Sequence, residues 1–580
     1  MLTLFKRWLN VPLGADQSSS SNPSKISRSK TKLGLGVAFA LGTMCASLHG
    51  AAAAPGPLVT TKEGIVQGTI TNTGVAEFLG VPYAEPPIGN LRWKPPKNHA
   101  PWAGVLKTQA YAPICAQITT LGVFAGPANN NEDCLYLNVF TPNLDPSARL
   151  PVIFWIHGGG NVDGETPGYD GSKMASDGKT VVVTLEYRLN LMGWLAHPAL
   201  DDEGHLFANY GLLDQQLVLK WVQRNIAQFG GDKNNVTVGG QSAGAVDTGL
   251  NMVSPLATGL FERGICESYC PSVLSPGGRS TPLTAAEAKG VAMSVAAGCG
   301  SGTGASTAKC LRNLTAAQVE ALAGTESASS QYTSGQGIID GQIVPIDPVT
   351  AFKTGAFNHV PLMNGNTEDE INFLLAITEY FSGPPRVNVT AAQDLNYVNT
   401  TWNPPTYPAG TAAKVLARYP LSAFASPQLA WDRLATDSSI CGERIVDKIL
   451  VTQIPVYAYE FDDQTAPSYF PKMPGFLELA YHTADIQYLF PLWHGGPAPP
   501  SVIHSLNKKQ TDLSDQLVAA WTNFAWTGNP NGLGNYPWPR YSNSTIKPAW
   551  LIQDLPVLST LTDPQYSALR KCDFWDTLAP

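Results

Sequence analysis

Residues 240–244 read Gly240-Gln241-Ser242-Ala243-Gly244, and their surroundings decide the fold prediction. The preceding run, Asn235-Val236-Thr237-Val238-Gly239, is typical of a strand, and the small residues that follow can begin a helix. A serine in a tight strand-to-helix turn, with small residues two positions away on either side, is typical of a nucleophile elbow. Ser242 is therefore the candidate nucleophile. The pattern is short enough to arise by chance in so glycine-rich a chain, so it needs support from other residues.

The segments around this turn alternate between strand and helix patterns. Continuous apolar runs at 150–156, 181–185 and 236–238 indicate strands that are buried on both faces, as central strands of a parallel sheet are. Residues 212–229 have apolar side chains at helical spacing and end at two glycines, which indicates a helix stop. The alternation from about 150 to 270 predicts an α/β fold: a large, mostly parallel central sheet with helices on both faces.

The flanking regions complete a single predicted domain. Residues 64–70 and 75–81 are typical of antiparallel strands. Beyond Pro276 the chain is helical and loop-rich, with strand signals at 360–363 and 456–461. There is no internal repeat, and no Ser/Gly-rich linker divides this part. We predict one domain over 55–580, with long loop and helical insertions.

Residues 1–54 differ in composition from the rest and predict a signal peptide preceded by a basic segment. Lys and Arg are crowded before the apolar run 33–41, and Ala51-Ala52-Ala53-Ala54-Pro55 offers a small-residue cleavage site. The apolar run is shorter than the roughly 20 residues that a membrane-spanning helix needs. We expect export, removal of 1–54, a secreted or periplasmic location, and no stable membrane insertion afterwards.

Charge and cysteine content narrow the function further. Without residues 1–54 the chain has 31 basic and 44 acidic residues, a formal net charge of −13. Such a surface argues against a nucleic-acid partner, and it leaves the oligomeric state open. Eight cysteines remain after Cys45 is removed, an even number that favours pairing in an exported protein. Cys266 and Cys270 fit either a pair or two buried thiols.

A nucleophilic serine needs a base and a site for the developing oxyanion. Gly158, Gly159 and Gly160 follow His157 at the end of a predicted buried strand, where exposed N–H groups can bind an oxyanion together with that of Ala243. The chain order nucleophile, acid, histidine then points to an acid before His482 or His494.

Two segments could supply the acid and the base. The acidic cluster in 365–370 follows the strand signal at 360–363, although on its own it is better interpreted as a solvated loop. His482 precedes an apolar, aromatic segment, and on its own it is better interpreted as a structural loop histidine. His494 lies among Gly and Pro.

Several motifs together carry a family resemblance. They are Asn131-Glu132-Asp133-Cys134-Leu135-Tyr136-Leu137-Asn138-Val139, His157-Gly158-Gly159-Gly160, Asn209-Tyr210-Gly211-Leu212-Leu213-Asp214-Gln215, Phe229-Gly230-Gly231-Asp232 and the elbow. In this order they resemble the type-B carboxylesterase/cholinesterase family of α/β hydrolases. The resemblance covers essentially the whole mature chain, because Glu370 and His482 also fall where that family has its acid and base.

The resemblance implies a role for each of these residues. Ser242 would be the nucleophile, His482 the general base and then acid, and Glu370 the carboxylate that orients the imidazole. Gly159, Gly160 and Ala243 would form the oxyanion hole. The implied disulfides are Cys115/Cys134, Cys299/Cys310 and Cys441/Cys572. The substrate would be a small-molecule ester, with no cofactor and no metal.

Departures from the family pattern concern selectivity rather than reaction class. Gln241 stands where the family usually has Glu, which predicts a weaker preference for cationic substrates. Asn161 replaces an aromatic residue, Glu186 replaces Asn, and 267–270 read Glu-Ser-Tyr-Cys where Gln-Ser-Gly and then a small residue are usual. We therefore predict an exported serine carboxylesterase. A lipase, an acyltransferase and a non-catalytic adhesion protein are the alternatives, and the short Cys115–Cys134 loop favours soluble or short-chain esters over triglycerides.

Overall fold

The computed structural model describes residues 56–119, 125–271, 280–323, 337–381, 386–404, 406–470, 472–473, 475–491, 505–532 and 535–579. The predicted signal peptide at 1–54 and the alternative base His494 lie outside these residues.

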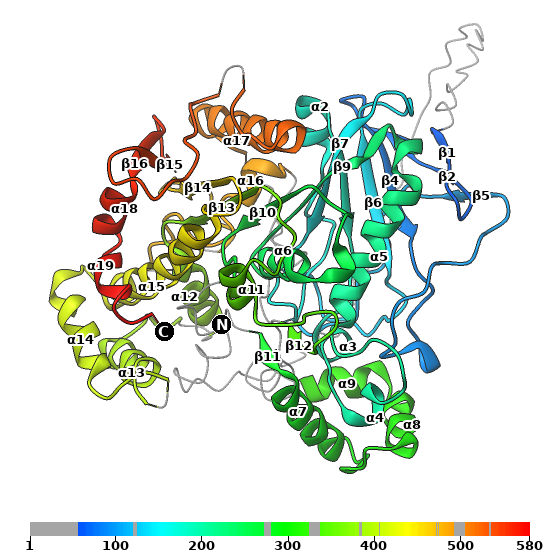
Figure 1. Ribbon diagram of the computed structural model, residues 1–580, viewed down its shortest axis with the longest axis horizontal. Helices are drawn as coiled ribbons and strands as arrows, with labels where there is room; N and C mark the ends of the chain where they lie inside the picture. The colour runs from blue at the N-terminus through cyan, green and yellow to red at the C-terminus, as the bar shows by residue number, and fades with distance from the viewer. Residues whose placement is uncertain are drawn as a thin grey trace, which may run out of the picture.

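A large twisted sheet forms the centre of the molecule (Figure 1). Within the described residues it has 11 strands in the order β16-β15-β14-β13-β10-β9-β7-β8-β6-β4-β3. Their bounds are β3 Thr69–Ile70, β4 Ala76–Pro82, β6 Tyr136–Thr141, β7 Leu150–Ile156, β8 Val181–Leu185, β9 Gly231–Gln241, β10 Arg263–Glu267, β13 Leu362–Thr367, β14 Val456–Phe461, β15 Pro548–Gln553 and β16 Ser559–Thr562. The strands from β8 to β15 pair in parallel, and the pairs at both edges are antiparallel. The predicted mostly parallel sheet is confirmed.

Burial explains why the central strands read as unbroken apolar runs. Every residue of β7 and β8 is buried, because helices cover both faces of the sheet at this point. The helices α5 and α6 lie over one face, and α2 and α17 pack together over the other (Figure 1). Branched and aromatic side chains suit such a two-sided contact, since they fill the space above and below the pleat.

The remaining elements surround this core. Two small sheets consist of β1 Leu58–Thr60, β2 Ile65–Gln67 and β5 Val105–Lys107, and of β11 Thr281–Pro282 and β12 Ile338–Ile339. The α-helices are α2 Ser172–Gly178, α3 Asn190–Gly193, α4 Pro198–Asp201, α5 Tyr210–Asn225, α6 Ala243–Val253, α7 Leu283–Ala296, α8 Ala305–Asn313, α9 Ala316–Ala323, α11 Pro348–Thr354, α12 Glu370–Phe381, α13 Ala391–Thr401, α14 Thr411–Arg418, α15 Pro427–Leu450, α16 Ile486–Leu489, α17 Lys508–Thr527, α18 Asp563–Leu569 and α19 Cys572–Trp575. Short 3₁₀ turns are η1 Gly89–Leu91, η3 Ile226–Phe229, η4 Pro255–Ala257 and η5 Leu421–Ala423.

Insertions between strands form the outlying parts. Helices α7 to α9 lie between β10 and β13 in sequence, and α12 to α15 between β13 and β14 (Figure 1). Beyond Pro276, the sequence predicts β13 and β14 but not the short strands β11 and β12, nor β15 and β16. β15 has a single short apolar run, and it becomes a strand by adding to the edge of β14 in parallel.

Three disulfides join the pairs that the resemblance implies. Cys115–Cys134 and Cys299–Cys310 close loops, and Cys441–Cys572 links α15 to the C-terminal tail across 131 residues of sequence. Cys266 and Cys270 are buried thiols. Among the described helices, none combines the length and the apolar character needed to cross a membrane.

Candidate active site

Ser242 sits on a strained turn between β9 and α6. Its φ of 59° and ψ of −120° are unfavourable for a residue with a Cβ atom, and the turn is held because the Ser242 N–H donates to the Glu267 carbonyl at 2.8 Å. A Cβ atom on Gly244 would lie 2.0 Å from the Ile156 carbonyl oxygen, and one on Gly240 would lie 2.5 Å from the same atom. The expectation that small residues must flank Ser242 at both positions is confirmed.

Glu370 begins α12, directly after the end of β13. One carboxylate oxygen, Oε1, accepts from the Thr367 N–H at 2.8 Å and from the Ser268 hydroxyl at 2.5 Å. The other, Oε2, lies 2.5 Å from Nδ1 of His482. Glu370 is fully buried and its neighbour Asp369 is 2% exposed, so the interpretation of this acidic cluster as a solvated loop is wrong. The cluster is buried because the long helix α15 packs against α12.

His482 lies between β14 and α16, with both ring nitrogens in contact with side chains. Nδ1 faces Glu370, and Nε2 lies 3.1 Å from the side-chain nitrogen of Gln241. The ring packs against Tyr269 and Phe373, with centroids 5.0 and 5.6 Å away. Within the described residues, no hydrogen bond joins the Ser242 hydroxyl to His482. The structure thus brings acid and histidine into contact and places the residue before the serine against the imidazole.

The glycine loop follows β7. Gly159 and Gly160 have φ values of 112° and 66°, and a Cβ atom on Gly159 would lie 1.7 Å from the Asp163 carbonyl oxygen. Neither glycine N–H donates a backbone hydrogen bond within the described residues. As the first residue of α6, Ala243 likewise has no carbonyl in the preceding turn of the helix. Three N–H groups are therefore available at the ends of two adjacent strands, β7 and β9.

His157 precedes this loop, and its ring is packed and hydrogen-bonded inside the protein. Its ring stacks on Tyr187 at 4.5 Å, and Nδ1 contacts the Gly158 carbonyl at 2.8 Å. Burial lowers the pKa of His157 to about 4, so the ring is neutral in ordinary conditions. It therefore supports the loop.

Two further buried acids, Glu267 beside Gln241 and Asp485 near His482, are not among the residues predicted for the site. Glu267 is the parallel-strand neighbour of Gln241, and the Trp521 indole N–H donates to its carboxyl at 2.5 Å. Burial and the nearby Asp485 raise the pKa of Glu267. Burial and Glu370 raise the pKa of Asp485 to about 7, against the opposing effect of His482. The spacing of three residues from His482 to Asp485 is the signal that could have identified the latter, since a helical turn brings such positions together.

Comparison with known proteins places the chain in a family. Residues 55–575 match the model of the carboxylesterase family. The medium-chain fatty acyl-CoA hydrolase precursor of Anas platyrhynchos is 32% identical over 518 residues, covering 84% of this chain and 87% of the relative. Carboxylesterase 1C of Rattus norvegicus is 31% identical, covering 84% and 88%. Fumonisin B1 esterase of Sphingopyxis macrogoltabida is 33% identical, covering 83% and 84%.

The similarity extends over nearly all the described residues and agrees with the fold, whose parallel sheet carries Ser242 at the end of β9 and Glu370 just beyond β13. The α/β-hydrolase fold predicted from the motifs is confirmed. The chain belongs to the carboxylesterase family and is a carboxylic ester hydrolase.

Proposed function

We propose that this protein is an exported serine esterase that hydrolyses carboxylic esters through an acyl-enzyme on Ser242. The observation that carries the proposal is the 2.5 Å contact between Glu370 and Nδ1 of His482, buried beside a strained serine elbow. A carboxylate in this position orients the imidazole and favours its protonated form during the reaction. A non-glycine residue with a positive φ and a ψ far from the left-handed helical region, as at Ser242, is typical of a functional position.

In the first step, the Ser242 oxygen attacks the ester carbonyl while Nε2 of His482 takes the hydroxyl proton. The Ser242 hydroxyl has to reach Nε2, which the Gln241 side chain contacts in the structure. Catalytic hydrogen bonds often tighten only when substrate is bound. The N–H groups of Gly159, Gly160 and Ala243 would hold the tetrahedral oxyanion, and each such donor contributes about 3 kcal/mol.

The tetrahedral intermediate then collapses: the bond from its central carbon to the alkoxy oxygen breaks, His482 gives its proton to that oxygen, and the alcohol leaves the serine acylated. Water then attacks the acyl carbonyl and loses a proton to His482, and the collapse of the second tetrahedral intermediate releases the acid and restores the Ser242 hydroxyl. Every proton in this cycle passes through the same nitrogen, so no metal or cofactor is required.

For the substrate, we infer soluble or short-chain esters, because Cys115 and Cys134 are only 19 residues apart in sequence and leave little chain for a lid that opens on a lipid surface. The relatives named for fumonisin B1 and for medium-chain fatty acyl-CoA add these two compounds to the panel worth testing. A sharp rise in activity as an ester exceeds its solubility limit would instead indicate a lipase. We also propose that residues 1–54 are removed on export and that residues 55–580 form a single domain. Mass measurement of the mature N-terminus would test the removal.

The direct test is Ser242→Ala, with Ser254→Ala as the control. Ser254 lies directly after α6 and is buried, and its hydroxyl accepts from Gln216 at 3.0 Å. We expect loss of about 10⁶-fold in kcat for the first variant and activity within about twofold for the second. A phosphonate ester that labels serine esterases should add its mass to the peptide that contains Ser242.

Other outcomes identify the alternative functions. Activity retained in Ser242→Ala would contradict the acyl-enzyme. Product partitioning to an added alcohol, rather than to water, would indicate an acyltransferase. No turnover of any ester by the unmodified protein would favour an adhesion role.

A further inference from the structure

Asp369 joins the two loops that carry the acid and the base. Its N–H donates to the Ala480 carbonyl at 3.0 Å, and its carboxylate Oδ2 accepts from the Ala480 N–H at 3.2 Å. Asp369 immediately precedes Glu370, and Ala480 is two residues before His482. These two hydrogen bonds therefore hold together the segments on which the Glu370–His482 contact depends.

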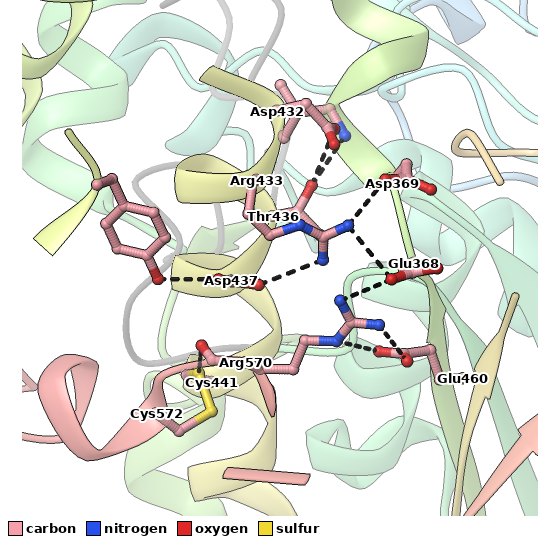
Figure 2. A network of polar contacts seen from close by, with 12 residues as sticks. Glu368, Asp369, Asp432, Arg433, Thr436, Asp437, Cys441, Glu460, Arg570 and Cys572 are labelled. Carbon is pink, nitrogen blue, oxygen red and sulfur yellow. Dashed lines mark hydrogen bonds and ion pairs between the residues drawn. A yellow bond between two sulfur atoms is a disulfide. The ribbon is translucent and has the colours of Figure 1, made fainter. Parts of the chain in front are cut away.

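The Asp369 carboxylate is fixed in turn by side chains from other segments. Arg433, on α15, donates to Oδ1 of Asp369 at 2.9 Å and contacts Glu368 at 3.4 Å (Figure 2). Gln464, after β14, donates to Oδ2 of Asp369 at 2.8 Å and to Glu368 at 2.5 Å. Asp369 thus has a partner on each carboxylate oxygen although it is 2% exposed.

The C-terminal tail supplies a third support. Arg570 is 2% exposed and donates to Glu368 at 3.0 Å and to Glu460 of β14 at 2.9 Å (Figure 2). Two residues later, Cys572 is bonded to Cys441 of α15. The disulfide therefore ties the tail to the helix that carries Arg433, and both arginines meet at Glu368.

Packing considerations alone do not explain such a cluster of charged side chains in a protein interior. Buried ion pairs lose hydration that their attraction often fails to repay, and apolar side chains of similar size pack at least as well. A network of directed hydrogen bonds does provide fixed geometry between segments that are far apart in sequence.

We propose that Asp369 is a positioning residue that holds Glu370 and His482 in register, and that Arg433 and Arg570 keep its carboxylate in place. This inference rests on the proposed function, since it assigns a role relative to the acid–base pair.

The test compares two arginines of the same helix. Arg444, like Arg433, is on α15 and forms ion pairs, but its partners are Asp563 and Asp576 of the tail, at 2.6 and 3.1 Å. It does not contact the acid loop among the described residues. We expect Arg433→Gln and Asp369→Asn to lower kcat about 10- to 100-fold, with KM within about threefold, because small displacements of catalytic groups have effects of this size.

Rates are expressed per active site, counted by labelling with the phosphonate ester, so that lost protein does not count as lost catalysis. Arg433→Lys should recover at least about fivefold of the loss in Arg433→Gln, because the ammonium keeps one charged donor. Arg570→Gln should lower kcat about threefold to tenfold, since Arg570 reaches Asp369 only through Glu368. Arg444→Gln should keep kcat within about twofold, whatever its thermal stability.

The inference is overturned if Asp369→Asn and Arg433→Gln keep kcat per active site, or if Arg444→Gln loses as much as Arg433→Gln. Should Asp369→Asn fail to fold, the comparison of Arg433 with Arg444 decides alone. Failure of the proposed function looks different: Ser242 would not be labelled, and Ser242→Ala would remain active.

Discussion

The two halves of the active site are held in place by different kinds of interaction. On the nucleophile side, the backbone does the positioning: Ser242 is fixed by its strand, its helix and glycines that let β7 approach closely. On the acid–base side, side chains do it: guanidinium groups from α15 and the tail and an amide group from the loop after β14 bind Glu368 and Asp369, the two residues before Glu370. Activity should therefore fall when atoms are added on the nucleophile side and when charged groups are removed on the acid–base side.

The largest effect is expected on the acid–base side. Glu370→Gln keeps the shape of the side chain but can place its amide N–H₂ against Nδ1 of His482, which leaves Nε2 protonated and unable to act as a base. We expect kcat to fall about 10⁴-fold, as for other triads in which the tautomer is wrong. Initial rates on a p-nitrophenyl ester would measure it.

The control is Glu379→Gln, a buried acid on the same helix whose carboxylate accepts from the Val389 N–H at 3.0 Å. It should keep kcat within about twofold. Equal losses in both variants would show that α12 needs its charges for folding and would remove the evidence for a special role of Glu370.

An added methyl group should break the nucleophile side. In Gly244→Ala the new Cβ would lie 2.0 Å from the Ile156 carbonyl oxygen and 2.8 Å from its carbon, which are backbone atoms that cannot rotate away. We expect about 100-fold lower kcat and about 3 kcal/mol lower free energy of unfolding. Gly304→Ala is the matched change, because no atom lies within 4 Å of its Cβ position. A Gly244→Ala variant as active as Gly304→Ala would contradict backbone positioning of the elbow.

Gln241 and Glu267 lie side by side on neighbouring strands, where the two halves of the site meet. Exchanging their side chains tests whether the position of the carboxyl group sets the preference for cationic substrates. Gln241→Glu with Glu267→Gln places the acid beside Ser242, and we expect the ratio of kcat/KM for acetylcholine over 3,3-dimethylbutyl acetate to rise about fivefold. Gln241→Glu alone should raise it less, because Glu267 and Asp485 already crowd the position with acids. A high ratio in the unmodified protein would contradict the weak cation preference that Gln241 predicts.

The smallest effect on activity is expected from neutralising a carboxyl group on the nucleophile side, where the backbone rather than charge positions the groups. Glu186 follows β8, and its Oε1 accepts from the N–H and the hydroxyl of Thr166, both at 2.8 Å. Burial raises the pKa of Glu186 from 4.5 to about 8. The folded state therefore holds its proton more tightly than the unfolded chain, and its stability falls as pH rises between those two values.

Glu186→Gln keeps the acceptor and removes the ionisation. Its advantage in free energy of unfolding should be small near pH 5 and grow to a few kcal/mol near pH 8. Urea denaturation at several pH values would show it. A stability difference that does not change with pH would mean that Glu186 does not titrate in this range.

Much of the fold and the nucleophile side could be predicted because the relevant information is local. The runs at 150–156 and 181–185 are apolar because both faces are covered, and Gly240 and Gly244 flank Ser242 because the turn excludes a Cβ atom. Such constraints act on neighbouring residues and appear as patterns in one stretch of chain. The strand β15 escaped prediction because its existence depends on pairing with β14, which is about ninety residues earlier in the sequence.

The sequence by itself therefore determined the strand–helix alternation and the elbow at Ser242 from steric demands between adjacent residues, and it indicated the reaction class through the family resemblance of its motifs. Only the tertiary structure decided that the acidic cluster at 365–370 is buried, that Glu267 lies beside Gln241 and that Asp369 connects the loops of Glu370 and His482. Taken one at a time, these residues look like ordinary loop polar groups. Their roles arise from desolvation and from partners such as Arg433 and Arg570, which reach them only after segments distant in sequence have packed together.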